Sequence, residues 1–225
     1  MCGRFTLLLT PELLAVVYEV SAPASQEPRY NIAPTQEVLV VREEPAGNRI
    51  IGPLRWGLVP HWAKEISIGS KLINARCETI HEKSSFRHAI RSRRCIIPAS
   101  GYFEWAASSS GKLPHYITMR DESPMSLAGI WETWKAPDGK SLETVALLTT
   151  RANSMLAAIH DRMPVILHPG EFALWLDRTA TDPHKLERLY QPFPSERIQA
   201  WPVSKAVNNA AHNSAECIQP LTVPP

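Results

Sequence analysis

Cys2 directly follows Met1 in the sequence. Removal of Met1 would leave a free α-amine and a thiol on adjacent carbons. An α-amine with a pKa of about 7.7 to 8.0 is partly neutral at pH 7, so it can attack an aldehyde, whereas a lysine amine near 10.4 is almost fully charged. The neighbouring thiol can then close on the imine carbon to give a thiazolidine, an intramolecular step. The alternative is an incidental cysteine that is small enough to bury.

Two further segments carry polar groups that would be costly to bury without a purpose. Asn74 and Arg76 place an amide and a guanidinium after an apolar pair, at a predicted strand end or tight loop, where the amide could equally be a turn former. Glu104 lies among aromatic residues, and desolvation there would favour its protonated form and suit it to carry a proton. A carboxylate pointing outward from an edge strand is the alternative for Glu104.

His160 precedes an acid, a base and a proline, which makes it either a proton-transfer group or a satisfied structural histidine. Ser204 lies in a segment of small polar and basic residues after a predicted strand. This segment is equally compatible with a turn and with anion contacts.

Several enzyme classes are disfavoured by the absence of their motifs. The eight histidines show no H-E-x-x-H pairing and the cysteines are scattered, so we expect no metal site. There is no Walker A motif, no G-x-G-x-x-G and no G-x-S-x-G elbow, and we expect no cofactor. Most of the seven tryptophans are predicted to lie in the core, although one or two could stack on unpaired bases.

Basic residues gather between Lys83 and Arg94, although the net charge of the chain is only +2. The cluster is either a solvated helix face or a surface that faces phosphates. Its members are Lys83, Arg87, His88, Arg91, Arg93 and Arg94.

Short apolar or alternating runs outnumber segments of helical periodicity, and the two kinds do not alternate along the chain. This pattern favours an α+β fold, a single domain with a barrel-like, largely antiparallel β core and a few peripheral helices. Strands are predicted at 50–58, 95–98, 115–119, 127–131 and 144–148, helices at 11–20, 84–92, 169–176 and 184–190, and loop tips at 43–48, 106–112 and 136–140.

Composition supports a folded globular chain, since 44% of the 225 residues are hydrophobic and 20% are charged. No apolar run approaches the roughly 18 residues that span a bilayer, and the first residues do not resemble a signal peptide. We therefore expect a cytoplasmic protein without a membrane partner. Its four cysteines, which show no C-x-x-C spacing, are expected to be free thiols.

Six motifs taken together resemble the SOS-response-associated peptidase (SRAP) family. In the family's order they are Met1–Phe5, Tyr30–Thr35, Trp56–Lys64, Ile73–Thr79, Gly101–Trp105 and His160–Pro164. The resemblance implies an SRAP domain over 1–220 with a C-terminal tail at 221–225. It also implies covalent processing of abasic sites in single-stranded DNA through Cys2, with possible lyase and self-processing peptidase activity, and nucleoid association when bound to DNA. We expect a monomer.

The resemblance implies a role for each motif residue. Cys2 would be the nucleophile, Asn74 and Glu104 would assist proton transfer and orient the sugar, and His160 would stand close by. The implied DNA contacts are Arg4 and Arg76 to phosphates, Pro34 and Trp62 to bases, and Ser204. The sequence departs from the family at Ser100, where relatives often carry Asp or Gly.

Two other functions remain open on the sequence. One is a cysteine-dependent peptidase that acts on protein substrates with Cys2 and His160 as the working pair. The other is a noncatalytic single-strand binder that relies on arginines and aromatic residues.

Overall fold

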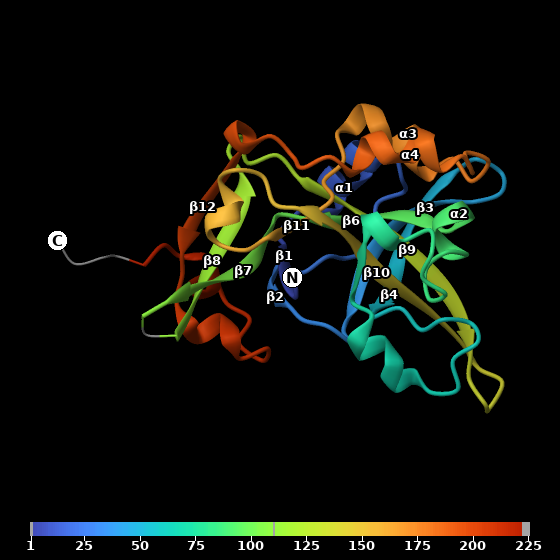
Figure 1. Cartoon of the computed structure of the whole chain (residues 1–225), viewed down its shortest axis with the longest axis horizontal. Helices are drawn as coiled ribbons and strands as arrows, with labels where there is room; N and C mark the ends of the chain where they lie inside the picture. The colour runs from blue at the N-terminus through green and yellow to red at the C-terminus, as the bar shows by residue number, and fades with distance from the viewer. Residues whose placement is uncertain (1, 110, 222–225) are drawn as a thin grey trace.

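The computed structural model describes residues 2–109 and 111–221, so the predicted tail beyond Leu221 lies outside the described residues. Short helices and twelve strands make up this part of the chain (Figure 1). The strands are β1 (Arg4–Leu7), β2 (Arg29–Ile32), β3 (Glu37–Glu43), β4 (Arg49–Trp56), β5 (Asn74–Arg76), β6 (Arg94–Ala99), β7 (Gly101–Ser108), β8 (Gly111–Met119), β9 (Met125–Lys135), β10 (Ser141–Arg151), β11 (Arg162–Pro164) and β12 (Ile198–Pro202). The α-helices are α1 (Pro11–Tyr18), α2 (Ala89–Ser92), α3 (Phe172–Leu176) and α4 (Pro183–Glu187).

Five of the strands close into a barrel. β3 pairs with β4 and with β6, β6 pairs with β9, and β9 pairs with β10, all antiparallel. β10 then pairs with β4 in parallel and completes the ring. Beyond this ring, β10 extends to pair with β5 in parallel and with β11 antiparallel. Segments that are distant in sequence therefore meet along β10.

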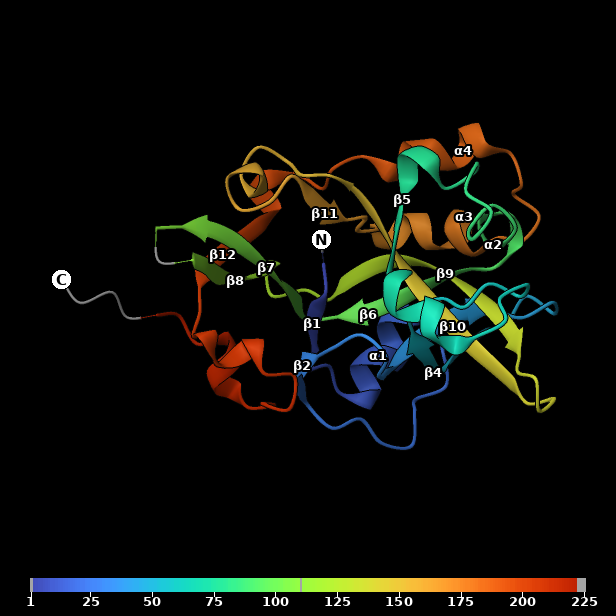
Figure 2. The same cartoon turned by 60° about the horizontal axis from the view of Figure 1, so that its bottom comes forward.

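The second sheet is antiparallel, in the order β12-β8-β7-β1-β2. Figures 1 and 2 show it on the C-terminal side of the barrel, with the N-terminus between the two sheets. The ring of Phe5 in β1 contacts that of Trp56 in β4 edge-on, with the centroids 5.2 Å apart, so aromatic packing joins the sheet to the barrel.

Helices cover the barrel at its edges. In α1, Thr10 caps the backbone N–H of Leu13 and Pro11 occupies the first turn, which explains why the helix begins there. The ring of Tyr18 stacks on Phe172 of α3, and its hydroxyl lies 3.1 Å from the hydroxyl of Ser126. No helix among the described residues is long and apolar enough to cross a membrane.

The predicted fold class is confirmed: an α+β arrangement with a barrel-like, largely antiparallel core. Two local predictions are wrong. Only Ala89–Ser92 of the predicted helix 84–92 is α-helical, and no side chain caps its start. The predicted loop 106–112 is mostly strand, because β7 runs to Ser108 and β8 resumes at Gly111. The short strands β1, β2 and β11 went unpredicted, as did the longer strands β3 and β7.

Gly57, directly after β4, has a positive φ of 122°, and a Cβ there would lie 2.6 Å from the carbonyl oxygen of Gly69. We predict that Gly57→Ala lowers the free energy of unfolding by about 1 to 3 kcal/mol. Urea denaturation measures this loss. The matched control is Gly52→Ala in β4, where a Cβ meets nothing within 4 Å. Equal stability of the two variants would contradict the strain assigned to Gly57.

Candidate functional site

Cys2 lies just before β1, an inner strand of the second sheet that pairs with β7. Arg4 of β1 pairs with Phe103 of β7, so the residues just before Arg4 run beside Glu104. The side chain of Cys2 is buried, with an exposed fraction of 1%. Burial raises the pKa of the Cys2 thiol well above its ordinary range, and the negative charge of Glu104 raises it further. The thiol is therefore neutral at pH 7 in this form of the chain.

Asn74 reaches the same place from the barrel. β5 pairs with β10 through Asn74 and Leu147, and the Asn74 side-chain Nδ2 donates to the carbonyl oxygen of Cys2 at 2.9 Å. Its Oδ1 is buried and has no hydrogen-bond partner among the described residues. The turn-former alternative is therefore wrong, because the amide bonds a residue 72 positions away. A buried acceptor without a partner costs free energy. The Asn74 Oδ1 beside position 2 can therefore accept a hydrogen bond from a group that binds there.

Glu104 and His160 meet beside Cys2. Glu104 has an exposed fraction of 5%, so the alternative of an outward-facing carboxylate is wrong. The Nε2 of His160 lies 4.0 Å from the Oε1 of Glu104. On the other side of the ring, Nδ1 accepts the backbone N–H of Arg162 at 3.0 Å and lies 2.9 Å from the Oδ1 of Asp161. A protonated Nδ1 favours Asp161 and a neutral Nδ1 favours Arg162, so the ring has a partner in either state.

An ion pair that the sequence analysis missed holds the segments of Asn74 and His160 together. Arg162, with an exposed fraction of 7%, donates to both carboxylate oxygens of Glu78, at 2.6 and 2.9 Å. It also donates to the backbone oxygen of Thr149 in β10 at 2.7 Å. The hydrogen bonds from Arg162 lower the pKa of Glu78. Because Glu78 closely follows β5 and Arg162 begins β11, the pair clamps the two short strands on either side of β10.

Arg4 is engaged within the protein. Its guanidinium donates to the Oδ1 of Asn31 at 3.0 Å and to the carbonyl oxygens of Val207 and Asn208 at 2.6 and 3.3 Å. Burial lowers the pKa of Arg4. Asn31, which belonged to a motif but was given no role, donates to three carbonyls of the segment after β12, those of Val207, Asn209 and His212.

The other predicted DNA contacts lie at the surface. Arg76 is exposed at the end of β5, and Pro34 is partly exposed between β2 and β3. Trp62 has an exposed fraction of 49%. Ser204 accepts the backbone N–H of Ala206 at 3.2 Å and caps a 3-10 turn.

Trp62 belongs to a groove of about 520 Å³ that is separate from the Cys2 cluster. The groove also contains Lys64 and Lys71. Among the described residues, no hydrogen bond or ion pair connects Trp62 or Pro34 to Cys2, Asn74, Glu104 or His160. The structure thus brings the four predicted catalytic residues together, and none of them lines the groove that contains Trp62.

Tyr102 is a further neighbour of the cluster that sequence reasoning missed. It is buried in β7, where burial, with added effects of Cys2 and Glu104, raises its pKa well above the usual range. Within residues 2–109 and 111–221, no three His, Cys, Asp or Glu side chains are arranged to hold a metal ion. The cluster therefore offers an amide, a carboxylate, an imidazole and a neutral thiol around residue 2, which is a set suited to proton transfer at that residue.

Comparisons with known proteins support the motif resemblance. The model of the family described as SOS response associated peptidase (SRAP) matches residues 1–210. A Bacillus subtilis protein named abasic site processing protein YoqW is 40% identical over 223 residues, covering 97% of this chain and 99% of that protein. Mouse abasic site processing protein HMCES is 33% identical over 272 aligned residues, covering 98% of this chain and 76% of that protein.

Solved structures show the same architecture. A crystal structure of a protein from Bacteroides thetaiotaomicron superimposes with a TM-score of 0.87 at 27% identity, covering 97% of this chain and 99% of that one. A protein from Bordetella bronchiseptica superimposes with a TM-score of 0.78 at 26% identity, covering 90% of this chain and all of that one.

The clamp between Glu78 and Arg162 predicts a stability difference that depends on pH. Glu78→Gln should lower the free energy of unfolding at pH 7 by about 1 to 2 kcal/mol, since one partner is half exposed. The pKa of Glu78 is lowered on folding, so its contribution is fully present above the unfolded value near 4.5 and is lost as the pH falls through the folded value. Urea denaturation of both proteins from pH 7 to pH 3 should show the difference shrinking below about pH 4.5. A constant difference would show that the charge of Glu78 is not responsible.

Proposed function

Because the chain belongs to the SOS response associated peptidase family, we propose that it processes abasic sites in single-stranded DNA by a covalent link through Cys2. The observation that carries this proposal is the convergence of Asn74, Glu104 and His160 on residue 2. Relatives named for abasic site processing align with nearly the whole chain. An abasic site in its open form carries an aldehyde at C1′, the electrophile that a 1,2-aminothiol traps.

The proposed reaction has two steps once Met1 is removed. The α-amine of Cys2 attacks C1′ and forms a carbinolamine, which loses water to give an imine. The thiol then adds to the imine carbon, forming the Sγ–C1′ bond, while its proton passes to the nitrogen. The product is a thiazolidine that holds DNA and protein together.

The surrounding groups have distinct roles in this scheme. Glu104 and His160 transfer protons at the carbinolamine, because the departing hydroxyl needs a proton to leave as water. The Asn74 amide holds the backbone of Cys2 and offers its buried Oδ1 to the sugar hydroxyl. Exposed Arg76 binds a phosphate beside the lesion.

The remaining DNA contacts are assigned to the surface around this cluster. Trp62 and Pro34 contact bases, and Ser204 contacts the backbone near Arg4. The guanidinium of Arg4 already bonds Val207 and Asn208, so its part is to hold that surface in place and to add positive charge. We further propose a monomer that associates with the nucleoid when bound to DNA, and an imine that can undergo β-elimination.

A peptidase with Cys2 and His160 as its working pair fits the geometry less well. Thiol nucleophiles act as thiolates, and the buried environment of Cys2, with Glu104 nearby, raises the pKa of the thiol. The ring nitrogens of His160 lie against Glu104, Asp161 and the backbone of Arg162, which orients the imidazole towards carboxylates. Turnover of a peptide by the mature protein would reverse this preference.

Cys2→Ala should abolish the heat-stable adduct with single-stranded DNA that carries one abasic site. The measurement is a denaturing gel, with the intact mass of each protein establishing whether Met1 is absent. Cys95→Ala is the matched control, because Cys95 is equally buried but lies in β6, inside the barrel. It should form the adduct at the wild-type yield.

Undiminished adduct from Cys2→Ala would refute the role of the thiol. Binding that survives in this variant, with all DNA released on denaturation of the wild type, would favour the noncatalytic binder. A wild-type protein without Met1 that gives no adduct would reject the covalent mechanism.

Glu104→Gln should slow adduct formation at least tenfold and leave the affinity for undamaged DNA within about twofold, because it removes a proton carrier and keeps the shape. Single-turnover gel assays give the rate and fluorescence anisotropy gives the affinity. Equal losses in rate and affinity would contradict proton transfer by Glu104. Borohydride should trap the imine in the wild type.

A further inference from the structure

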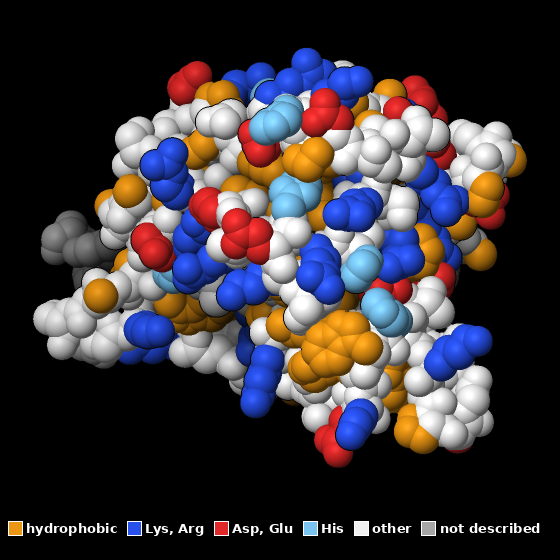
Figure 3. All heavy atoms as spheres, turned by 45° about the vertical axis from the view of Figure 1, so that its right-hand side comes forward, with side chains coloured by type: hydrophobic (Ala, Val, Ile, Leu, Met, Phe, Trp, Pro, Cys, Tyr) orange, Lys and Arg blue, Asp and Glu red, His pale blue; other side chains and the backbone are white. Residues whose placement is uncertain are grey.

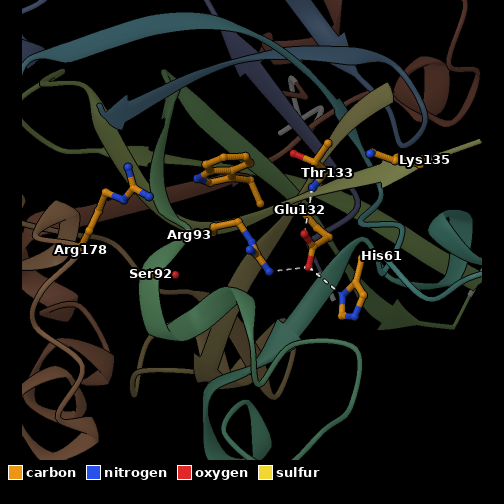
Figure 4. A pocket seen from close by; sticks show the side chains of 8 residues that line it. His61, Ser92, Arg93, Glu132, Thr133, Lys135 and Arg178 are labelled. Carbon is orange, nitrogen blue, oxygen red and sulfur yellow. Dashed lines mark hydrogen bonds and ion pairs between the residues drawn. The ribbon is translucent and has the colours of Figure 1, made fainter. Parts of the chain in front are cut away.

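A second hollow lies on the barrel, formed by β9, the end of α2, His61 and Arg178, which lies two residues after α3. Its volume is about 450 Å³ (Figure 4). Basic residues and histidines dominate its wall and that of the adjoining hollow. The two are lined by His61, His88, Arg91, Ser92, Arg93, Trp131, Glu132, Thr133, Lys135 and Arg178. We refer to them together as the basic hollow.

Glu132 is the acidic residue in this wall, and its charge is already matched. Its Oε2 accepts from Arg93 at 2.7 Å and lies 3.4 Å from the Nδ1 of His61. Its Oε1 accepts the backbone N–H of Thr133 at 3.0 Å. Glu132 is almost fully buried behind these partners. Its negative charge therefore reduces the positive potential at the opening of the hollow only slightly.

Three cations remain at the mouth. The side chains of Arg91, Lys135 and Arg178 are exposed, and none forms an ion pair with another described residue. The nearest acidic neighbour in sequence, Asp177, directs its Oδ1 to the backbone and hydroxyl of Thr179. Cations that converge on a hollow without compensating carboxylates attract a polyanion.

The basic hollow continues from the predicted base-stacking residue. His61 lines the hollow and Trp62 lines the neighbouring groove, so adjacent residues connect the two. Figure 3 shows Lys, Arg and His side chains gathered around an exposed hydrophobic patch on this side of the molecule. A strand that stacks a base on Trp62 would therefore bring its next phosphates towards the basic hollow.

We propose that the basic hollow binds the phosphodiester backbone of single-stranded DNA beyond the nucleotides that reach Cys2. This proposal rests on the proposed function, since it extends the path of the same DNA strand. Lys135 and Arg178 each neutralise a phosphate, and the pair of Glu132 with Arg93 keeps the floor of the hollow in place. Affinity therefore grows with strand length until the strand fills the hollow.

The test compares two charge-matched double variants of the full chain. Lys135→Gln/Arg178→Gln removes two cations from the basic hollow. Lys185→Gln/Arg188→Gln removes two exposed cations from a different hollow, beside α4. Anisotropy measures the affinity for undamaged single strands of increasing length at several salt concentrations.

We expect the Lys135→Gln/Arg178→Gln variant to bind long strands about tenfold more weakly than the wild type at 0.15 M salt. We also expect the magnitude of its slope of log K against log salt to fall by about 1.4, because each of the two lost phosphate contacts accounts for about 0.7. Its affinity for the shortest strands should match that of the wild type. The control variant should match the wild type in both affinity and salt slope at every strand length. Equal losses in both variants, or no loss in the first, would overturn the proposal.

The adduct assay separates this result from the proposed function. The first variant retains Cys2, Asn74, Glu104 and His160, so saturating abasic DNA should give the wild-type adduct yield. Failure of the wild type to form an adduct would refute the covalent mechanism, while the salt slope on undamaged DNA still decides whether the basic hollow binds phosphates.

Discussion

The hydrogen bond from Asn74 to the carbonyl of Cys2 connects two sheets that otherwise contribute separate halves of the site. Cys2 and Glu104 belong to the five-stranded sheet, through β1 and β7. Asn74 and His160 belong to the barrel, through the strands that pair with β10. Neither sheet alone supplies all four of these side chains. The candidate site forms because the barrel and the sheet pack so that β5 meets the residue just before β1.

β10 makes this arrangement possible, because it pairs with four other strands. One stretch of it closes the ring with β4 and β9, and the following residues pair with β5 and β11. The ion pair between Glu78 and Arg162 then ties the two short strands together and bonds to β10 at Thr149. The pair joins a buried Arg162 to a half-exposed Glu78, and its two parallel hydrogen bonds favour one relative placement of the two strands. This placement fixes the positions of Asn74 and His160.

Sequence alone predicted the type of fold and named four residues that the structure places close together, but not how they are held. Runs such as 144–148 are almost continuously apolar and identify a buried central strand, whereas β1 and β5 are only three or four residues long and carry no periodicity. The predicted helix 84–92 failed because its regular spacing reflects a series of turns anchored by buried Phe86. Arg94, assigned by sequence to a solvated or phosphate-facing cluster, is buried and donates to backbone carbonyls of Ile90 and Trp175.

The burial of the Cys2 sulfur bears on the order of the proposed steps. A thiol whose pKa is raised by burial and by Glu104 is a weak first nucleophile at neutral pH. An α-amine needs no such activation, since part of it is neutral at that pH. In the proposed reaction the amine therefore attacks first, and the thiol adds only when an imine carbon lies within bonding distance. The same burial protects the sulfur from oxidants, because oxidation requires thiolate character and exposure. A low nucleophilicity that would disable a cysteine peptidase is thus compatible with a residue that must react once, with one aldehyde.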